Sequence, residues 1–340
     1  MPGTPLLFTP YTVRGLKLAN RVVMSPMCQY RTRGDGLAHA WHRVHYGARA
    51  VGGVGLIIVE ATGVLPEGRI TVGDLGLWED AQADALREIV DFAHSLHTPI
   101  GIQISHAGRK AELPDPVGPS PVPFAPDWKT PRPLTVGELD GVVEAFARAA
   151  RRAVAVGFDC LEVHAAHGYL LHQFLSPLSN RREDAYGTGP EGRARLLREV
   201  LAAVRAELPA AMPLFLRISA TDWHDGGLTP AQFRPLLPSF VEAGVDVLDV
   251  SSGGLIPQPP PAVYPGYQVP LAEELAHPAL ARMAIGILEY FPLAENTLRR
   301  GAADLIALGR GLLRDPYWPL RTAREHGLAL TPPAPYERAW

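Results

Sequence analysis

Eight short apolar runs recur along the chain, and segments with a helical pattern separate them. The runs are mostly continuous in their apolar residues, which is typical of strands buried on both faces of a parallel sheet. They read RVVMSP (21–26), GLIIVEAT (55–62), PIGIQISH (99–106), CLEVHAAHG (160–168), PLFLRIS (213–219), VDVLDVSSG (245–253), ARMAIGIL (281–288) and ADLIALGR (303–310).

Eight strands that alternate with helices predict an α/β protein, a (β/α)8 TIM barrel formed by a single domain over residues 1–340. An open doubly wound sheet is the alternative, but its usual G-x-G-x-x-G turn follows none of the runs. The segment LLFTPYTVRGLKLAN predicts a short N-terminal β-hairpin that caps the barrel bottom. Helices are expected to stop at Gly157, Pro209 and Gly244, and the proline-dense stretches 113–133 and 257–270 are expected to form long loops.

The composition excludes several classes of protein. Of the 340 residues, 47% are hydrophobic, which is ample for one large core, and the formal net charge of −3 gives no reason to expect nucleic acid or an anionic membrane as a partner. No stretch is long and apolar enough to cross a membrane, and the N-terminus lacks a secretion-signal pattern, so we expect a cytoplasmic protein. Two cysteines, Cys28 and Cys160, are too few for a four-thiolate zinc site or an iron–sulfur cluster, and a disulfide framework is not expected.

In a TIM barrel the active site gathers at the carboxyl ends of the strands. Polar, small and basic residues stand at these ends, and carboxylates are nearly missing, which argues against a magnesium or calcium site. The residues at the strand ends are Ser25 to Cys28, Ala61 and Thr62, Gln103 to His106, His164 to His167, Arg217, Ser251 to Gly254, Gly286, and Gly309 with Arg310.

His164 and His167 end one strand, and three interpretations of this pair remain open. With His106 as a third ligand they would hold a metal, although no carboxylate or thiolate is near them in the sequence. They would otherwise be hydrogen-bonded structural residues, or donors to an oxygen of a substrate. The third interpretation is favoured, since Tyr169 follows two residues later and its phenol would deliver a proton.

Two arginines at strand ends indicate an anionic ligand. Arg217 lies in an apolar strand and needs an anionic partner, either a bound anion or a carboxylate on a neighbouring strand, Glu162 or Asp249. Gly309 and Arg310 follow the eighth strand, where barrels commonly bind phosphate through backbone N–H groups and a helix start. Gly286, after the seventh strand, would supply the second wall of this phosphate site.

With these residues in place, the chain resembles the Old Yellow Enzyme family, in its thermophilic-like branch of FMN-dependent NADPH dehydrogenases and ene-reductases. The resemblance spans essentially the whole chain. It is carried by MSPMCQY (24–30), QISHAGRK (103–110), FDCLEVHAAHGYLLHQFLSPLSNRREDAYG (158–187), LRIS (216–219), DVSSGG (249–254), ADLIALGR (303–310) and YERAW (336–340).

The resemblance implies a role for each matching position. Tyr169 would be the proton donor, His164 and His167 would bind the substrate oxygen, and Cys28 would tune the flavin. Substrate-binding residues would be Tyr30, Lys110, His164, His167 and Arg338. Cofactor-binding residues would be Ser25, Pro26, Met27, Cys28, Ala61, Gln103, Arg217, Ser252, Gly286, Gly309 and Arg310.

The same resemblance implies the reaction and the assembly. NADPH or NADH reduces FMN, whose N5 then passes a hydride to the C=C bond of an α,β-unsaturated carbonyl or nitro compound. A reductase acting mainly on nitrate esters, nitroaromatics or quinones is the alternative. Arg338, in the C-terminal tail 331–340, is expected to reach a neighbouring subunit's site, so the partner is a second copy in a homodimer or a dimer-based homotetramer. No metal is expected.

The chain departs from the family pattern along the seventh strand. Glu289 stands where a small polar residue is usual, so it brings an acid near the expected phosphate site. Cys160 also replaces a small residue and is expected in the core. Competing enzymes are disfavoured: relatives with an iron–sulfur cluster need more cysteines, a flavin-free barrel needs a catalytic lysine or metal-binding carboxylate at a strand end, and a non-catalytic flavin-binding protein would lack the histidine pair or Tyr169.

Overall fold

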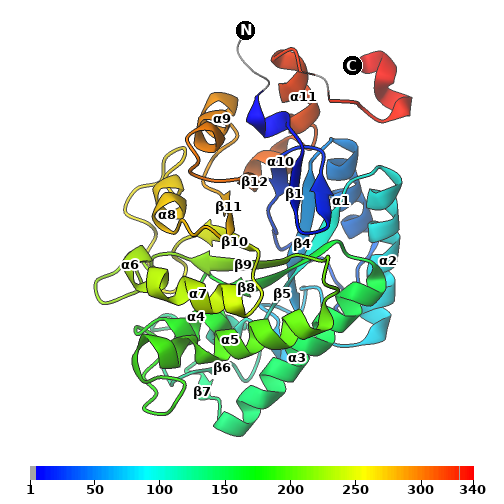
Figure 1. Cartoon of the computed structure of the whole chain (residues 1–340). Coiled ribbons are helices and arrows are strands. Elements are labelled where there is room, and N and C mark those ends of the chain that lie inside the picture. The colour runs from blue at the N-terminus through cyan, green and yellow to red at the C-terminus, as the bar shows by residue number, and fades with distance from the viewer. Residues whose placement is uncertain (1–4, 329) are drawn as a thin grey trace.

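The computed structural model describes residues 5–328 and 330–340 and contains a closed barrel of eight parallel strands (Figure 1). Each strand coincides with one of the eight apolar runs, with β4 extending one residue beyond its run, so the predicted fold class is confirmed. The order around the barrel is β10-β11-β12-β3-β4-β5-β8-β9. The strands are β3 (Val22–Met24), β4 (Leu56–Gly63), β5 (Ile100–Ser105), β8 (Cys160–Ala165), β9 (Leu214–Ser219), β10 (Val247–Ser251), β11 (Ala281–Ala284) and β12 (Leu305–Leu308).

Helices surround the barrel (Figure 1). The longest, α3, begins at Thr135, whose hydroxyl accepts from the N–H of Glu138, and ends at Gly157 with a φ of 102°, which favours glycine. The α-helices are α1 (Ala40–Val51), α2 (Asp80–Ser95), α3 (Val136–Val156), α4 (Leu170–Leu175), α5 (Gly189–Glu207), α6 (Pro230–Phe233), α7 (Leu237–Glu242), α8 (Val269–Glu274), α9 (Phe291–Arg299), α10 (Arg310–Arg314) and α11 (Trp318–Glu325). Short 3-10 helices are η1 (Leu6–Phe8), η2 (Pro66–Gly68), η3 (Gly108–Lys110), η4 (Arg234–Leu236) and η5 (Ala334–Ala339).

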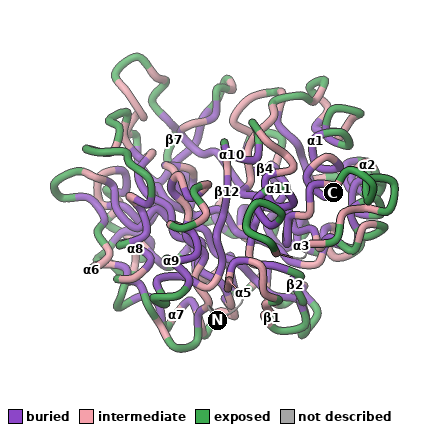
Figure 2. The backbone as a smooth tube through the Cα atoms, turned by 90° about the horizontal axis from the view of Figure 1, so that it is seen from above, coloured by how far each residue is buried: buried purple, intermediate pink, exposed green. Residues whose placement is uncertain are grey.

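The apolar core has two parts, as the alternation of strand side chains requires. Val22 and Met24 of β3 belong to the larger cluster, which includes the buried faces of the helices, whereas Val23 between them belongs to a smaller cluster. Members of the smaller cluster come from seven of the eight strands, so this cluster fills the barrel interior. Viewed from above, buried segments gather in the centre of the molecule and most exposed segments lie around them (Figure 2).

The predicted hairpin is present as β1 (Tyr11–Val13) and β2 (Leu16–Leu18), paired antiparallel. Leu16 and Leu18 are buried in the interior cluster, so the hairpin closes one end of the barrel with apolar side chains. At its turn, the N–H of Gly15 donates to the carbonyl of Ala211, just before β9. The hairpin therefore caps the amino ends of the strands, as the sequence predicts.

Both proline-dense stretches lie in long loops, the loop after β5 and the loop after β10, and one arginine connects these two loops. The first contains the short strands β6 (Val117–Gly118) and β7 (Arg132–Pro133). The buried Arg109 donates from Nη1 to the carbonyl of Val122 at 3.0 Å and from Nη2 to the carbonyl of Leu255 at 2.6 Å. The loop after β5 and the loop after β10 are thus held to each other across the barrel mouth.

We expect Gly101→Ala to destabilise the barrel through Cys160. The two residues face each other on β5 and β8, and a methyl group at position 101 would collide with the Cys160 sulfur. Overpacking of this kind lowers the free energy of unfolding by about 1–3 kcal/mol. Urea denaturation should detect this loss, and Cys160→Ala, which removes the colliding atom, should restore part of it in the double variant. Strictly additive losses would contradict this account.

Candidate active site

The barrel brings the predicted site residues to one end. Ser25 follows β3, Ala61 lies in β4, Gln103 in β5 and Arg217 in β9. The remaining positions at this end lie within or directly after strand ends or in the loops that follow them: Pro26, Met27, Cys28, Tyr30, Lys110, His164, His167, Tyr169, Ser252, Gly286, Gly309 and Arg310. The described structure therefore gathers at one mouth every predicted site residue except Arg338.

Arg338 lies in η5, away from the mouth of its own barrel. The segment before it, residues 330–335, borders a cavity together with Asn20, Gly55 and Thr98, which stand just before or at the starts of strands. The tail thus runs along the end of the barrel opposite the mouth.

Three rings meet at the mouth. The rings of His164 and His167 have centroids 5.2 Å apart at an interplanar angle of 83°, and the ring of Tyr169 lies 5.0 Å from that of His164. Burial, reinforced by the charge of Arg217, holds the pKa of both imidazoles well below 6.5, so both are neutral at pH 7. Burial also raises the pKa of Tyr169, which keeps its proton.

Hydrogen bonds orient the two imidazoles. Nδ1 of His164 accepts from the N–H of Ala166 at 3.3 Å, which leaves the proton on Nε2. Nε2 of His167 lies 2.8 Å from the hydroxyl of Ser251, at the end of β10. Ser251 was among the strand-end residues in the sequence, but its contact with His167 was not anticipated.

Lys110, in η3, lies against the backbone that follows β8, next to His167 and Tyr169. Its ammonium donates to the carbonyls of His167 at 2.9 Å and Gly254 at 3.1 Å, and it lies 5.1 Å from the centre of the Tyr169 ring and 4.5 Å from that of Phe124. Burial and the nearby Arg109 lower its pKa to about 8. Lys110 therefore links two backbone segments besides lying beside the tyrosine.

Cys28 and Tyr30 form the wall contributed by the segment after β3. Burial, together with the carboxylates of Glu60 and Asp74, raises the pKa of the Cys28 thiol, which is thus protonated and not a nucleophile. Tyr30 is 48% exposed and hydrogen-bonds to Cys28, which places its ring at the edge of the mouth.

Glu60 supports this wall from β4 and was missed by sequence reasoning. Its carboxylate accepts from the N–H of Gln29 at 2.6 Å and from the hydroxyl of Tyr46 at 2.9 Å, and burial raises its pKa to about 7. A single acid within the apolar run GLIIVEAT was the available signal, because a fully buried carboxyl needs such partners.

Arg217 has the carboxylate partner that the sequence left open. Its Nε lies 3.2 Å from Oδ2 of Asp249 on β10, and its Nη1 donates to the Ser25 hydroxyl at 3.0 Å. Glu162, the other candidate, instead accepts from Nε2 of Gln103 at 2.7 Å, and burial raises the pKa of Glu162 to about 8. Acids therefore do lie beneath the mouth, inside the strands and not at their ends.

A cavity of about 400 Å³ extends from this ring cluster along the ends of β10, β11 and β12. Ser252, Gly286, Gly309 and Arg310 line it, as the sequence predicts for a phosphate site. Other residues that line it are Tyr267, Gln268 and Arg314. Gln268 comes from the second proline-dense loop, which has no periodic pattern to reveal that it folds back over the strand ends.

Glu289 also lines this cavity, but its charge is compensated. Its carboxylate lies 2.6 Å from Nη2 of Arg314, the last residue of α10. The acid that departs from the family pattern is therefore matched by a cation four residues after Arg310.

No group of three or more histidine, cysteine or acidic residues in the described part of the chain is arranged to hold a metal ion. Among these residues there is also no helix with the length and apolarity needed to span a membrane.

Comparison with known proteins identifies the family. Residues 6–329 match the NADH:flavin oxidoreductase / NADH oxidase family, and the chain belongs to it. It is 50% identical over 338 residues to a protein named NADPH dehydrogenase from Geobacillus thermodenitrificans, covering 98% of each chain. The resemblance to the Old Yellow Enzymes is thereby confirmed, and the chain is an FMN-dependent oxidoreductase.

Solved structures agree with this assignment. Morphinone reductase superimposes with a TM-score of 0.81 at 30% identity, over 98% of this chain and 93% of that one. An Old Yellow Enzyme homologue from Zymomonas mobilis has a TM-score of 0.81 at 28% identity, over 96% and 94% of the two chains.

The cavity residues fit the phosphate end of FMN. Arg310 supplies positive charge, Arg314 offsets the charge of Glu289, and Gly309 precedes α10, whose first N–H groups lack partners within the helix. The space beside Gly309 is open, since a methyl group added there would meet only the sulfur of Met27. Gly286 has a φ of 128°, which favours glycine. The donors and the open space suit a phosphate and a polar chain.

We expect Arg314→Ala to weaken FMN binding, because it leaves the Glu289 carboxylate uncompensated at the cavity. Titration of the apoprotein with FMN, followed by the quenching of flavin fluorescence, should give an affinity about three- to tenfold lower. Glu289→Gln in the Arg314→Ala background should recover most of this loss. A double variant no better than the single one would contradict the explanation.

Proposed function

We propose that this chain uses NADPH to reduce C=C bonds conjugated to a carbonyl or nitro group. The observation that carries the proposal is the cluster of two neutral imidazoles and a protonated phenol at the mouth, beside the cavity that fits FMN. The name NADPH dehydrogenase of the curated relatives supports NADPH as the reductant.

FMN would be held along the strand ends by the residues that the sequence singles out. Arg310, Gly309, Gly286 and Ser252 would hold its phosphate and ribityl chain in the cavity. Ser25, Pro26, Met27, Cys28, Ala61, Gln103 and Arg217 would contact its ring system. When bound, FMN supplies the hydride chemistry.

The ring cluster would bind the substrate and supply a proton. A neutral imidazole donates a hydrogen bond without itself being a strong acid, so His164 and His167 would stabilise the negative charge that develops on the substrate oxygen. Tyr169, held protonated by burial, would give its proton to the α-carbon. The protonated thiol of Cys28 would border the flavin, and Tyr30 and Lys110 would line the substrate pocket.

The site would be completed by a second copy of the chain. The whole chain would form one domain, and its tail would lie at a subunit interface. The position of the tail at the far end of its own barrel supports this, since Arg338 then reaches a mouth only if that mouth belongs to a neighbour. We therefore propose a homodimer or a dimer-based homotetramer.

Anaerobic mixing tests the function directly. The purified protein should be yellow, NADPH should bleach it, and 2-cyclohexenone should restore the colour as it is reduced. Colourless protein that takes up no added FMN would contradict the proposal. Reoxidation by a quinone or a nitroaromatic compound, but by no enone, would assign the site to those acceptors instead.

Tyr169→Phe should separate proton supply from hydride chemistry. Loss of a positioned general acid slows a reaction by about 10²–10⁴-fold, so reoxidation by 2-cyclohexenone should slow accordingly while bleaching by NADPH persists. Stopped-flow absorbance measures both steps. Tyr11→Phe, in the hairpin at the opposite end, is the matched control. Undiminished reoxidation would mean that another group supplies the proton.

A further inference from the structure

The backbone of His167 and Gly168 forms a turn that four side chains hold in place. Both residues have positive φ, 56° for His167 and 75° for Gly168, so the turn needs external support. Each N–H and each C=O of the two residues has a side-chain partner. The partners are the Ser219 hydroxyl for the N–H of His167, the Lys110 ammonium for its C=O, Nδ1 of His172 for the N–H of Gly168, and Nε2 of Gln173 for its C=O.

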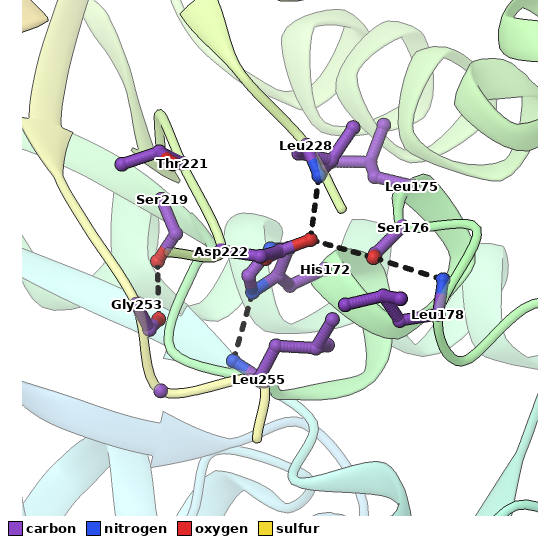
Figure 3. Close-up of polar contacts among 12 residues, drawn as sticks. His172, Leu175, Ser176, Leu178, Ser219, Thr221, Asp222, Leu228, Gly253 and Leu255 are labelled. Atoms are coloured by element: carbon purple, nitrogen blue, oxygen red, sulfur yellow. Dashed lines mark hydrogen bonds and ion pairs between the residues drawn. The ribbon is translucent and has the colours of Figure 1, made fainter. Parts of the chain in front are cut away.

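His172 is the one of these partners that connects the turn to a buried acid. It is fully buried on α4, and its Nδ1 accepts from the N–H of Gly168 at 2.9 Å. A nitrogen that accepts carries no proton, so the proton of this imidazole sits on Nε2. Nε2 lies 3.0 Å from Oδ1 of Asp222, in the loop after β9 (Figure 3).

The other oxygen of Asp222 is committed to two donors. Oδ2 accepts from the Ser176 hydroxyl at 2.7 Å and from the N–H of Leu228 at 2.7 Å (Figure 3). Burial opposes ionisation of Asp222, but His172 and these hydrogen bonds outweigh it and hold the pKa of the carboxyl below its ordinary value. With an N–H group and a hydroxyl on one side, the carboxylate can offer only its Oδ1 to His172.

From this arrangement we infer that His172 and Asp222 are a positioning pair for the substrate site. Asp222 keeps the proton of His172 on Nε2, which leaves Nδ1 free to hold Gly168. The backbone at Gly168 then sets the direction of the side chains of its two neighbours, His167 and Tyr169. This inference rests on the proposed function, because it concerns how those two residues meet an enone.

The arrangement predicts the effect of Asp222→Asn. The Ser176 hydroxyl and the Leu228 N–H continue to require an acceptor, so they fix the amide oxygen at the position of Oδ2 and turn the amide NH₂ towards His172. The NH₂ group forces the imidazole proton to Nδ1, where it opposes the N–H of Gly168. A variant of nearly unchanged size therefore disrupts the turn by changing the tautomer of His172.

Two substitutions of His172 make the test specific. In His172→Asn the side-chain oxygen takes the place of Nδ1 and accepts from Gly168, so the turn is kept without Asp222. In His172→Leu the acceptor is lost and the buried N–H of Gly168 has no partner. Loss of such a partner corresponds to a drop of about tenfold or more in a rate or affinity that depends on the turn.

The experiment compares the FMN-loaded wild type with Asp222→Asn, His172→Leu and His172→Asn. For each, kcat and KM with 2-cyclohexenone and NADPH are measured beside the FMN content and the melting temperature. We expect kcat/KM per bound FMN to fall about tenfold or more in Asp222→Asn and His172→Leu and to stay within about threefold of the wild type in His172→Asn.

The outcomes distinguish failure of the positioning pair from failure of the proposed function. If the wild type does not turn over 2-cyclohexenone, the proposed function fails. If the wild type is active and Asp222→Asn keeps full kcat/KM, or if His172→Asn is as impaired as His172→Leu, the positioning pair is refuted. Variants that lose only melting temperature, with unchanged kcat/KM per bound FMN, also refute it, since that result indicates a purely structural role.

Discussion

Closure of eight parallel strands is the constraint on which everything else in this molecule depends. A parallel barrel sends all its strands in one direction, so the residues at their carboxyl ends meet although they are far apart in the sequence. Ser25 and Arg217 are 192 positions apart and share a hydrogen bond at the mouth. Closure buries the inner face of each strand and the surrounding helices bury the outer face, which explains why the runs are apolar throughout.

Burial also determines the charge state of the site. The mouth holds imidazoles that are kept neutral and a phenol and a thiol that are kept protonated, with Arg217 as the permanent cation nearby. Below it, Glu162 and Asp249 are buried near the same guanidinium, and burial, together with repulsion from Asp249, raises the pKa of Glu162. The chain thus presents hydrogen-bond donors to a ligand at the ring cluster and keeps the carboxyl groups of Glu162 and Asp249 beneath it.

Much of this could be predicted from the sequence, for identifiable reasons. The strands and the hairpin follow from local patterns of apolar residues, and the position of Gly157 follows from helix-ending chemistry. His164, His167 and Tyr169 could be selected because strand ends converge. Gln268 and Arg314 could not, since they reach the cavity from a loop and from the end of a short helix. The Arg217–Asp249 pair was one of two options until the register of β9 and β10 placed the residues side by side.

The link made by Arg109 has a consequence for how this barrel can diversify. Arg109 lies in the loop after β5, and its guanidinium donates to carbonyls of that loop and of the loop after β10, so neither loop is an independent module. Exchange of the loop after β5 alone would remove the cation that holds the other loop, and exchange of the loop after β10 alone would leave the buried cation short of an acceptor. Evolution of a differently shaped barrel mouth on this scaffold should therefore require that the loops after β5 and β10 be exchanged together.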